Sequence, residues 1–248
     1  MKICMVAYSF YETDNRIMRY ADSLAQAGHD VDVVVLKKRN QDNFEDIRGV
    51  NVYRIQTRKF PEKTGKLAYF ARLSRFLIKS ATWLTCRCFA KRYDLIHVHS
   101  VPDFEVFAAV IPRLLGCKII LDIHDIVPEF YCSKFGACRK SMIFRALVLV
   151  ERISIAFSHH VIIANHLWYD RLIERSVAPS KCSVILNYPD SDIFKENSAD
   201  RNTKDFLVMY PGTINHHQGL DLLVRAFNLV GEEMPNAKLL IYGEGPDR

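Results

Sequence analysis

Short apolar runs rich in β-branched residues recur along this chain, and stretches with helical spacing separate them. This alternation constrains the fold more than any other feature, because it is typical of β-α-β units that build a parallel sheet. Most runs are apolar at nearly every position, as in strands covered by helices on both faces. The predicted strands are Ile3–Ala7, Val31–Leu36, Val50–Ile55, Leu95–Val98, Lys118–Leu121, Val161–Ala164 and Ser183–Leu186.

The first helix has clear end signals. Apolar spacing predicts it from about Arg16 to Ala27, between the first two strands. Asp14 is a suitable N-cap, and Gly28 follows the last turn, where glycine commonly ends a helix. The sequence therefore predicts a strand, a helix and a second strand in the first 36 residues.

The composition changes after Pro189. Residues 190–205 are polar and nearly without core residues, which is typical of a linker. Beyond them the pattern predicts a strand at Phe206–Tyr210, a helix at Leu220–Val230 and a strand at Lys238–Tyr242. One such unit cannot cover both faces of a doubly wound sheet. We therefore expect a Rossmann-like domain at 1–189, a linker at 190–205 and a truncated second Rossmann-like domain at 206–248.

Hydropathy indicates a protein that does not span a membrane, and the cysteines indicate a reducing compartment. No stretch reaches about 18 uninterrupted apolar residues, and the longest candidate, 142–169, contains Arg145, Glu151 and Arg152. The seven cysteines form no C-x-x-C pair, and several lie in apolar runs. We interpret them as reduced thiols of a cytoplasmic protein. A metal site at Cys86 and Cys88 is the weaker alternative, because no second pair accompanies them.

Positive charge is concentrated in one segment. The net charge of the chain is +6, yet residues 54–92 hold eleven Lys and Arg against one acidic residue, Glu62. That segment therefore carries +10 and the rest of the chain −4. Such asymmetry indicates an anionic surface as a partner.

Within this basic segment, residues 65–91 predict one long helix with two stripes. Opposite its apolar stripe, cations border aromatic side chains, which suits the interface of a membrane with anionic lipid. The alternative is that the aromatic stripe packs under a neighbouring element while the cations are solvated. No nucleic-acid-binding module accompanies the charge. The stripe predicted to face the sheet is Leu67, Phe70, Ala71, Ser74, Leu77, Ile78, Ala81, Leu84, Thr85 and Cys88, and the predicted membrane surface is Tyr69, Arg72, Arg75, Phe76, Lys79 and Trp83.

Five segments in this order and spacing resemble glycosyltransferase family 4, whose members have the GT-B fold of two facing Rossmann-like domains. The segments are DNRIMRYADSLAQAGHDVDVVV at 14–35, YDLIHVHS at 93–100, DIHDIVPEF at 122–130, ILNYPDSDIF at 185–194, and YPGTINHHQGLDLLVRAF at 210–227, followed by LLIYGEGPDR at the end. The resemblance covers nearly the whole chain.

The resemblance implies roles for polar residues of the first domain. His124 matches the family position that faces the donor sugar, so it is the predicted catalytic residue. Asp14, Arg16, His99 and Asp125 are the predicted acceptor or cleft residues, at strand ends and at the start of the first helix. The alternative is that His124 and Asp125 merely cap the chain after a strand, with Asp14 a simple N-cap and Arg16 solvated.

In the second domain the resemblance implies donor contacts at Gly212, Gln218, Gly219, Gly243 and Glu244. Two departures from the family affect the diphosphate: the loop SFYETDN lacks a glycine pair, and Gln218 stands where relatives have lysine. The resemblance implies two further glutamates, seven residues apart, which we expect after Arg248 in the second domain. The resemblance implies no metal and no cofactor apart from the nucleotide-diphosphate sugar.

The function implied is a retaining, hexosyl-type glycosyltransferase. It would move a sugar from a nucleotide-diphosphate sugar to a glycan or lipid-linked acceptor in bacterial surface polysaccharide synthesis. We expect it to lie on the cytoplasmic face of the plasma membrane as a peripheral protein. One alternative is a non-catalytic acceptor-binding or membrane-binding module, or half of a split enzyme. Another is a sugar-nucleotide epimerase of the same fold.

Overall fold

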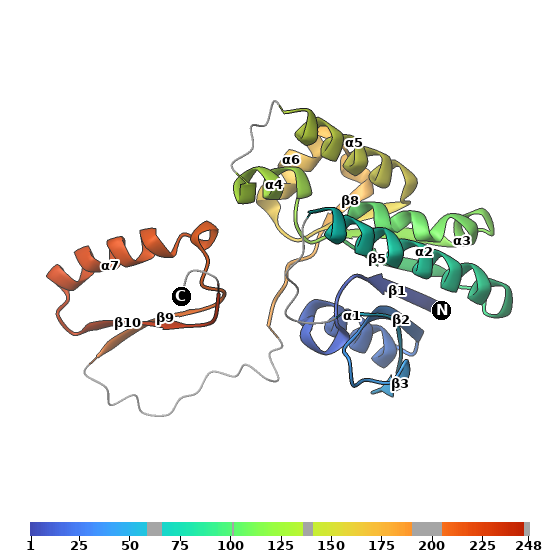
Figure 1. Ribbon diagram of the computed structural model, residues 1–248, viewed down its shortest axis with the longest axis horizontal. Coiled ribbons are helices and arrows are strands. Elements are labelled where there is room, and N and C mark those ends of the chain that lie inside the picture. Colours follow the sequence, from blue (N-terminus) through green and yellow to red (C-terminus); the bar gives the residue numbers. More distant parts are fainter. Residues whose placement is uncertain (59–65, 101, 136–140, 190–204, 246–248) are drawn as a thin grey trace. The chain divides into compact units, whose positions relative to one another are not determined.

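The computed structural model describes residues 1–58, 66–100, 102–135, 141–189 and 205–245. The chain divides into two compact units, Met1–Tyr188 (unit 1) and Pro189–Arg248 (unit 2), both with parallel strands and helices (Figure 1). Apart from Asp205, the predicted linker at 190–205 lies outside the described residues.

Unit 1 is built on one eight-stranded sheet with the order β3-β4-β2-β1-β5-β6-β7-β8. All neighbours are parallel except β3 and β4, which pair antiparallel at one edge. The seven strands predicted for this unit are confirmed; β3 was missed because its sequence FEDI has no apolar run. The strands are β1 Lys2–Ala7, β2 Asp30–Lys37, β3 Phe44–Ile47, β4 Val50–Thr57, β5 Leu95–His99, β6 Lys118–Ile123, β7 His160–Ile163 and β8 Cys182–Val184.

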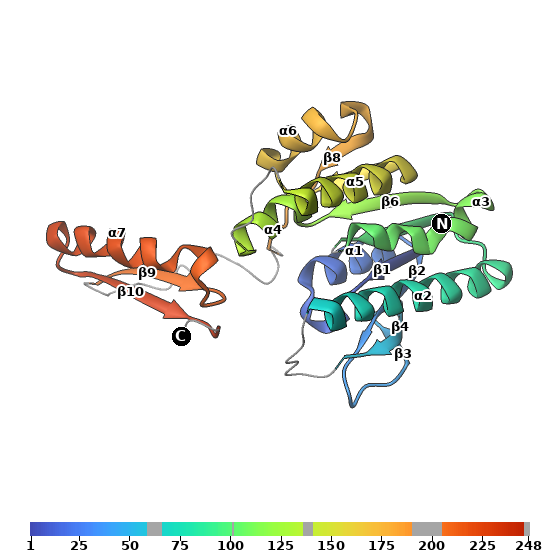
Figure 2. The ribbon, with the colours of Figure 1, turned by 45° about the horizontal axis from the view of Figure 1, so that its top comes forward.

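Helices connect these strands and cover the sheet (Figures 1 and 2). Among the described residues, no helix is both long and apolar enough to cross a membrane. The α-helices are α1 Asn15–Gln26, α2 Lys66–Ala90, α3 Val110–Leu114, α4 Val127–Phe135, α5 Met142–Phe157 and α6 His166–Arg175, and the 3-10 helices are η1 Tyr11–Thr13, η2 Asp103–Ala109 and η3 Pro179–Lys181.

The core of unit 1 forms two clusters, because successive strand residues point to opposite faces. Ile3 and Met5 of β1 join the cluster that contains Ile17 of α1. Cys4 and Val6 of the same strand join the cluster that contains residues of α2, α5 and α6. Strands apolar on both faces are therefore buried on both faces, as the sequence predicts.

The ends of α1 follow the sequence signals. The Asp14 side chain accepts a hydrogen bond from the Ile17 backbone N–H at 3.4 Å, which confirms Asp14 as the N-cap. Gly28 has φ +81°, a conformation that favours glycine after a helix. These two signals mark the start and the end of α1.

The orientation of α2 differs from the prediction. Its buried residues are Leu73, Phe76, Ser80, Leu84 and Cys88, so the inward stripe is turned by about one residue, roughly 100°, from the predicted one. Phe76, predicted to face outward, is fully buried and packs edge-on against the Tyr8 ring. Phe70 and Ile78, predicted to face the sheet, are 60% and 65% exposed. Several turns of this helix are apolar on more than one side, so spacing alone did not determine its rotation.

Unit 2 is a β-α-β element, with β9 Phe206–Pro211, η4 His216–Gln218, α7 Leu220–Glu233 and β10 Ala237–Tyr242. The two strands pair in parallel, and the three predicted elements are confirmed. No residue of α7 is buried, and the residues of both strands are exposed or half-buried.

Candidate functional site

Four polar side chains meet at the carboxyl edge of the unit 1 sheet: His97 and His99 of β5, Asp122 of β6, and His124 just after β6 (the His–Asp cluster). The alternation of β5 puts His97 and His99 on one face, and the strand register pairs His99 with Asp122. His124 follows two residues after Asp122. In parallel sheets this edge is where ligands bind.

The buried carboxylate of Asp122 is the centre of the cluster. Its Oδ2 atom lies 3.5 Å from His97 Nε2, 3.2 Å from His99 Nδ1 and 3.4 Å from His124 Nε2. His99 Nδ1 is in turn 3.2 Å from His124 Nε2. The Asp122 side chain is fully buried, whereas 19% of the His124 side chain is exposed. His124 is therefore the member that reaches solvent most.

Burial and mutual contact set the charges of the cluster. Burial alone raises the pKa of Asp122, but the imidazoles of His124, His97 and His99 outweigh it and hold that pKa well below its usual value. Burial lowers the pKa of His99 to about 3, and neighbouring His97 adds to the decrease. At neutral pH the cluster therefore contains an ionised Asp122 and a neutral His99.

Helix α1 supplies the wall beside this cluster. The Tyr20 ring packs against His97 and His99, with centroids 5.2 Å and 5.8 Å apart. Arg16, in the first turn of α1, has a buried Nη1 atom with no hydrogen-bond partner. Burial is the main cause of the raised pKa of Tyr20, and Asp122 and Arg16 also act on it, which places both charges near this ring.

The predicted cleft residues therefore fall into two groups. His99 and His124 are in direct contact, whereas Asp14 caps α1 and Asp125 lies half-buried in the turn before α4. Sequence reasoning missed Asp122 as a member of the site. The signal was present, since an acidic residue interrupts the apolar run KIILDI two residues before His124.

A second set of missed residues anchors the helices that follow His124. Arg175 at the end of α6 forms bidentate ion pairs with Glu129 of α4, at 2.5 and 3.0 Å, and with Glu151 of α5, at 2.9 and 2.5 Å. Glu151 is buried and also accepts from Ser176 Oγ at 2.5 Å. This network joins α4, α5 and α6, and α4 is the helix that follows the turn with His124 and Asp125.

In unit 2 the predicted donor residues gather at the carboxyl edge of β9 and β10. The Gly212 N–H donates to Tyr242 O at 2.9 Å, and the Ile214 N–H to Glu244 O at 3.1 Å. A Cβ at Gly243 would lie 1.7 Å from Gly212 O, so close backbone approach by itself requires that glycine. Gly219 has φ +74° and leads into α7, with Gln218 exposed just before it.

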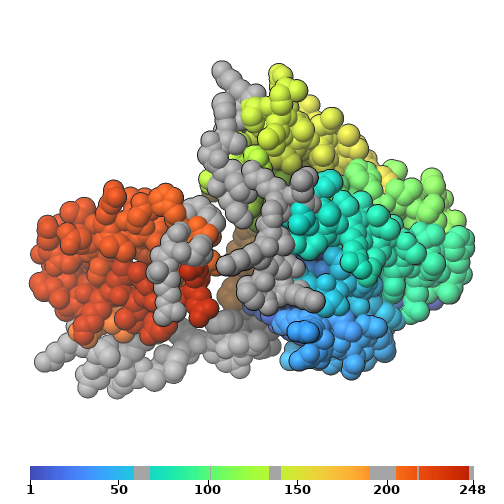
Figure 3. Space-filling model, viewed as in Figure 1, coloured from blue at the N-terminus to red at the C-terminus, as the bar shows by residue number. Residues whose placement is uncertain are grey.

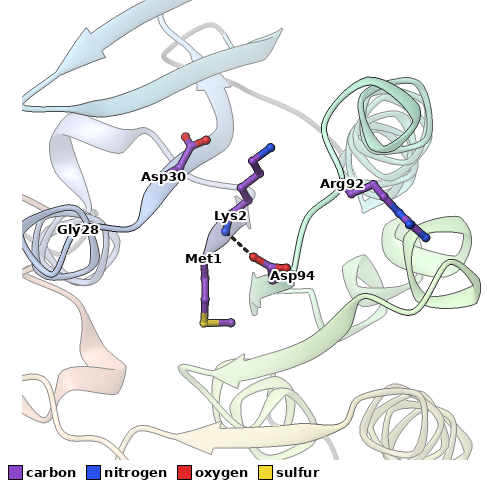
Figure 4. A pocket seen from close by; sticks show the side chains of 6 residues that line it. All are labelled: Met1, Lys2, Gly28, Asp30, Arg92 and Asp94. Atoms are coloured by element: carbon purple, nitrogen blue, oxygen red, sulfur yellow. Dashed lines mark hydrogen bonds between the residues drawn. The ribbon is translucent and has the colours of Figure 1, made fainter.

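A separate open hollow lies at the opposite, amino edge of the unit 1 sheet (Figure 4). There the Lys2 backbone N–H donates to Asp94 Oδ2 at 2.7 Å. That carboxylate ties β1 to the start of β5, so a structural role accounts for it. The lining residues are Met1, Lys2, Gly28, Asp30, Arg92 and Asp94.

The parallel sheet, its change of direction at β1 and the polar carboxyl edge define the class: a Rossmann-like unit of GT-B type. A model of the family described as "Glycosyl transferase 4-like domain" matches residues 13–187, and the chain belongs to this family. The resemblance seen in the sequence is thereby confirmed.

One curated relative is a phosphatidylinositol N-acetylglucosaminyltransferase subunit of Arabidopsis thaliana, 24% identical over 255 residues, which cover 99% of this chain and 53% of the relative. Among solved structures, a sucrose-phosphate synthase from Thermosynechococcus elongatus has a TM-score of 0.70 at 17% identity, over 100% of this chain and 64% of that chain. A lipopolysaccharide outer core galactosyltransferase, WaaB, has a TM-score of 0.57 at 10% identity, over 100% and 62%. The chain spans about half the length of the Arabidopsis relative, and the structural likenesses show the GT-B fold.

Proposed function

We propose that this protein is a retaining, hexosyl-type glycosyltransferase that uses a nucleotide-diphosphate sugar and a lipid-linked or glycan acceptor. A role in surface polysaccharide synthesis at the cytoplasmic face of the membrane is part of this proposal. Membership of the glycosyltransferase 4-like family supports the reaction type. The Arabidopsis relative is named for phosphatidylinositol, which supports a lipid acceptor.

The observation that carries the proposal is the His–Asp cluster. A buried, ionised Asp122 contacts three imidazoles, of which His124 is partly exposed at the carboxyl edge. The contact with the buried carboxylate orients the His124 ring. A histidine held in this way suits hydrogen bonding to a sugar hydroxyl and electrostatic stabilisation of the reacting centre.

Unit 2 supplies the proposed diphosphate contacts. Backbone N–H groups at the start of α7 and the glycine-containing ends of β9 and β10 are typical of phosphate-binding surfaces. Gln218 can donate a hydrogen bond there but cannot neutralise a phosphate. We expect this exchange of lysine for glutamine to weaken donor binding.

The donor proposal is tested by calorimetry with UDP and GDP. Gln218→Lys should tighten diphosphate binding by about 3- to 10-fold, because it adds a cation beside the helix N-terminus. Asn228→Lys, exposed in the middle of α7, adds the same charge elsewhere and is the matched control. Equal effects of the two variants, or no binding to the wild type and Gln218→Lys alike, would contradict a diphosphate site at this loop.

The transfer proposal is tested with radiolabelled nucleotide sugars and extracted lipid acceptors. His124→Ala should lower the transfer rate at least about 100-fold, the range for loss of an acid–base or charge-stabilising group. His166→Ala, exposed on α6, should leave the rate unchanged. NMR of the product anomer tests retention. A donor that changes configuration without any acceptor would identify an epimerase instead.

The membrane proposal rests on the outer face of α2, defined as Arg75, Ile78, Thr82 and Phe89. These residues recur at helical spacing on the exposed side, and Ile78 and Phe89 are 65% and 74% exposed. Part of the surface of α2 is visible in teal in the view of Figure 3. Apolar side chains beside a cation suit an anionic lipid surface.

Several residues of the predicted membrane surface have other partners. Phe76 is buried in the core, and Trp83 is half-buried against Tyr53, with centroids 4.9 Å apart. Lys79 Nζ donates to Ile55 O at 2.8 Å, and the Arg72 guanidinium lies 5.9 Å from the centre of the Tyr69 ring. The proposed surface therefore keeps Arg75 from the predicted set and adds Ile78, Thr82 and Phe89.

Liposome flotation tests this surface. Replacing Ile78 and Phe89 together by Asp should abolish binding to vesicles of phosphatidylglycerol, and Arg75→Ala should weaken it most at low salt. Leu167→Asp on α6, where the leucine is 83% exposed, is the matched control and should bind like the wild type. A wild type that binds neutral and anionic vesicles equally, or neither, contradicts the proposal.

A further inference from the structure

An open groove lies between helix α2 and the β3–β4 edge of the unit 1 sheet. Its volume is about 770 Å³. Sites for small molecules typically have about 300–1,000 Å³ and combine apolar and aromatic walls with a few polar groups. This groove has that character, since its lining includes Phe44, Tyr53 and Trp83 together with Lys37 and Lys79.

The aromatic wall of the groove is held in place by contacts among its own side chains. The Tyr53 ring packs against Phe44 of β3 and against Trp83 of α2, with centroids 5.0 Å and 4.9 Å apart. Arg87 Nη2 donates to Tyr53 Oη at 2.7 Å, and its guanidinium lies 5.1 Å from the centre of the Tyr53 ring and 5.7 Å from that of Trp83. These contacts form the wall before any ligand binds, which lowers the entropy cost of binding.

The groove also carries positive charge. Lys37 Nζ donates to Asn43 Oδ1 at 2.6 Å, and Lys79 Nζ donates to Ile55 O at 2.8 Å, so both of these acceptors are uncharged. Arg54 differs, because two glutamates form ion pairs with it. No acidic residue is among the described residues that line the groove. Burial lowers the pKa of Lys79, and an anion beside it would stabilise its charged form.

The groove is continuous with the outer face of α2. Ile78 and Thr82 belong to that face and also line the groove. The Ile78 side chain is 65% exposed, and Phe44 on the other side of the groove is 50% exposed. Aromatic residues and lysines, which combine an apolar body with a polar end, are typical of membrane interfaces. The groove therefore opens beside the surface proposed to contact anionic lipid.

We propose that this groove binds one acyl chain of an anionic glycerophospholipid, with the lipid phosphate beside Lys79 and Lys37. The chain would cover the rings of Phe44, Tyr53 and Trp83, and each buried methylene should tighten binding about threefold. The inference rests on the proposed membrane function and deepens it. The outer face of α2 contacts the bilayer surface, whereas the groove takes up a single lipid molecule.

Monomeric lipid distinguishes the groove from a bilayer surface. The chain has two tryptophans, so Trp168→Phe leaves Trp83 as the single tryptophan fluorophore. Dihexanoyl-phosphatidylglycerol, below its critical micelle concentration, should shift Trp83 emission to shorter wavelength with saturation. Dihexanoyl-phosphatidylcholine should bind about 3- to 10-fold more weakly, because its headgroup has no net negative charge. Glycerol 3-phosphate has the charge but no acyl chain and should cause no shift.

Cysteine alkylation is an independent measurement on the same complex. Cys86 lines the groove and is exposed, whereas Cys132 lies on α4 outside it. Bound dihexanoyl-phosphatidylglycerol should slow alkylation of Cys86 by N-ethylmaleimide at least about fivefold. The alkylation rate of Cys132, followed by peptide mass spectrometry in the same sample, should stay unchanged.

Matched variants of α2 locate the binding. Cys86→Glu puts a negative charge into the groove and should abolish binding of the monomeric lipid. Phe89→Glu puts the same charge on the outer face of α2 and should keep this binding while it lowers flotation on phosphatidylglycerol vesicles. Lys79→Gln should weaken binding of phosphatidylglycerol about 3- to 10-fold and leave that of phosphatidylcholine unchanged. Circular dichroism checks that each variant is folded.

Three results would overturn the groove as a lipid site: no saturable shift of Trp83 emission, equal binding in Cys86→Glu and the parent chain, or equal affinity for the two headgroups. Flotation of the same chain is scored separately. A chain that floats on vesicles but does not bind the monomer keeps the membrane surface and loses the groove. A chain that binds the monomer but does not float keeps the groove and loses the membrane surface.

Discussion

Units 1 and 2 contain the same kind of β-α-β sequence, yet they bury it differently. Met5 of β1 is fully buried, whereas Met209 of β9 is 60% exposed. Leu121 of β6 is fully buried, whereas Leu222 of α7 is 69% exposed. In unit 1 helices cover both faces of an eight-stranded sheet; within the described part of unit 2, α7 and the short η4 accompany two strands.

This difference shows that local patterning and burial are separate properties. The spacing of apolar residues predicts β9, α7 and β10 correctly, although no residue of α7 is buried. Whether a segment forms a helix or a strand follows from the spacing of its own apolar residues. Burial, in contrast, requires packing against segments from elsewhere in the sequence. We therefore expect the stability of unit 1 to depend on its side chains far more than that of unit 2.

The largest expected contrast is in amide hydrogen exchange. Amides of β1 and β2 should exchange through global unfolding of unit 1, and those of β9 and β10 through local opening. A difference of at least about 10³-fold in protection is expected, given typical domain stabilities. Mass spectrometry of peptides covering 1–37 and 205–242 measures it. Equal protection would show that β9 and β10 are covered in solution by residues other than those described for unit 2.

The next contrast is the pH dependence of stability. Burial raises the pKa of Glu105 on η2 to about 8, where its partner Ser80 opposes the rise only in part. The folded state therefore holds a proton that the unfolded chain releases at lower pH. The stability from this neutral carboxyl is fully present below about pH 4.5 and is lost as pH rises through 8. Glu105→Gln should remove this loss, on the order of 4 kcal/mol at pH 9.

Urea unfolding at pH 5 and pH 9 measures this contribution. Glu232→Gln, an exposed residue of α7 in unit 2, is the matched control and should follow the wild type. If Glu105→Gln shows the same pH slope as the wild type, Glu105 is not held neutral in the folded protein.

A matched pair of leucines tests burial itself. Leu121→Ala should lower the free energy of unfolding by about 3 kcal/mol, because it leaves a cavity in a packed core. Leu222→Ala should change it by less than about 0.5 kcal/mol. Chemical denaturation of both variants checks the pair. A comparable loss in Leu222→Ala would mean that Leu222 is buried in solution.

The smallest effect concerns helix caps. The Asn165 side chain accepts a hydrogen bond from the Trp168 N–H at 2.9 Å and caps α6, whereas α7 begins at Gly219 without a side-chain cap. Asn165→Ala should destabilise unit 1 by about 1 kcal/mol, and Asn165→Asp should retain most of the stability. Thermal unfolding of the two variants checks this. An equal loss of stability in Asn165→Ala and Asn165→Asp would show that Asn165 stabilises the protein through another contact and not as a helix cap.

Part of the candidate site could be predicted and part could not. His99 and His124 follow apolar runs, and the carboxyl ends of neighbouring parallel strands must share an edge. Asp122 and His97 became part of the site only through the pairing of β5 with β6, where His99 stands opposite Asp122. Likewise, Arg175 meets Glu129 and Glu151 across three helices, and no local spacing indicates such a contact.

By itself the sequence determined the parallel strands, helices α1, α2 and α7, the family and the residues at the strand ends, because these follow from periods of two and 3.6 residues and from short motifs. Tertiary structure decided which side of α2 is buried, where Phe76 points and how Asp122 gathers three histidines. The physical reason is that register and packing are set by contacts between distant segments. A helix with apolar residues on several sides, such as α2, adopts the rotation in which its side chains pack best against the sheet.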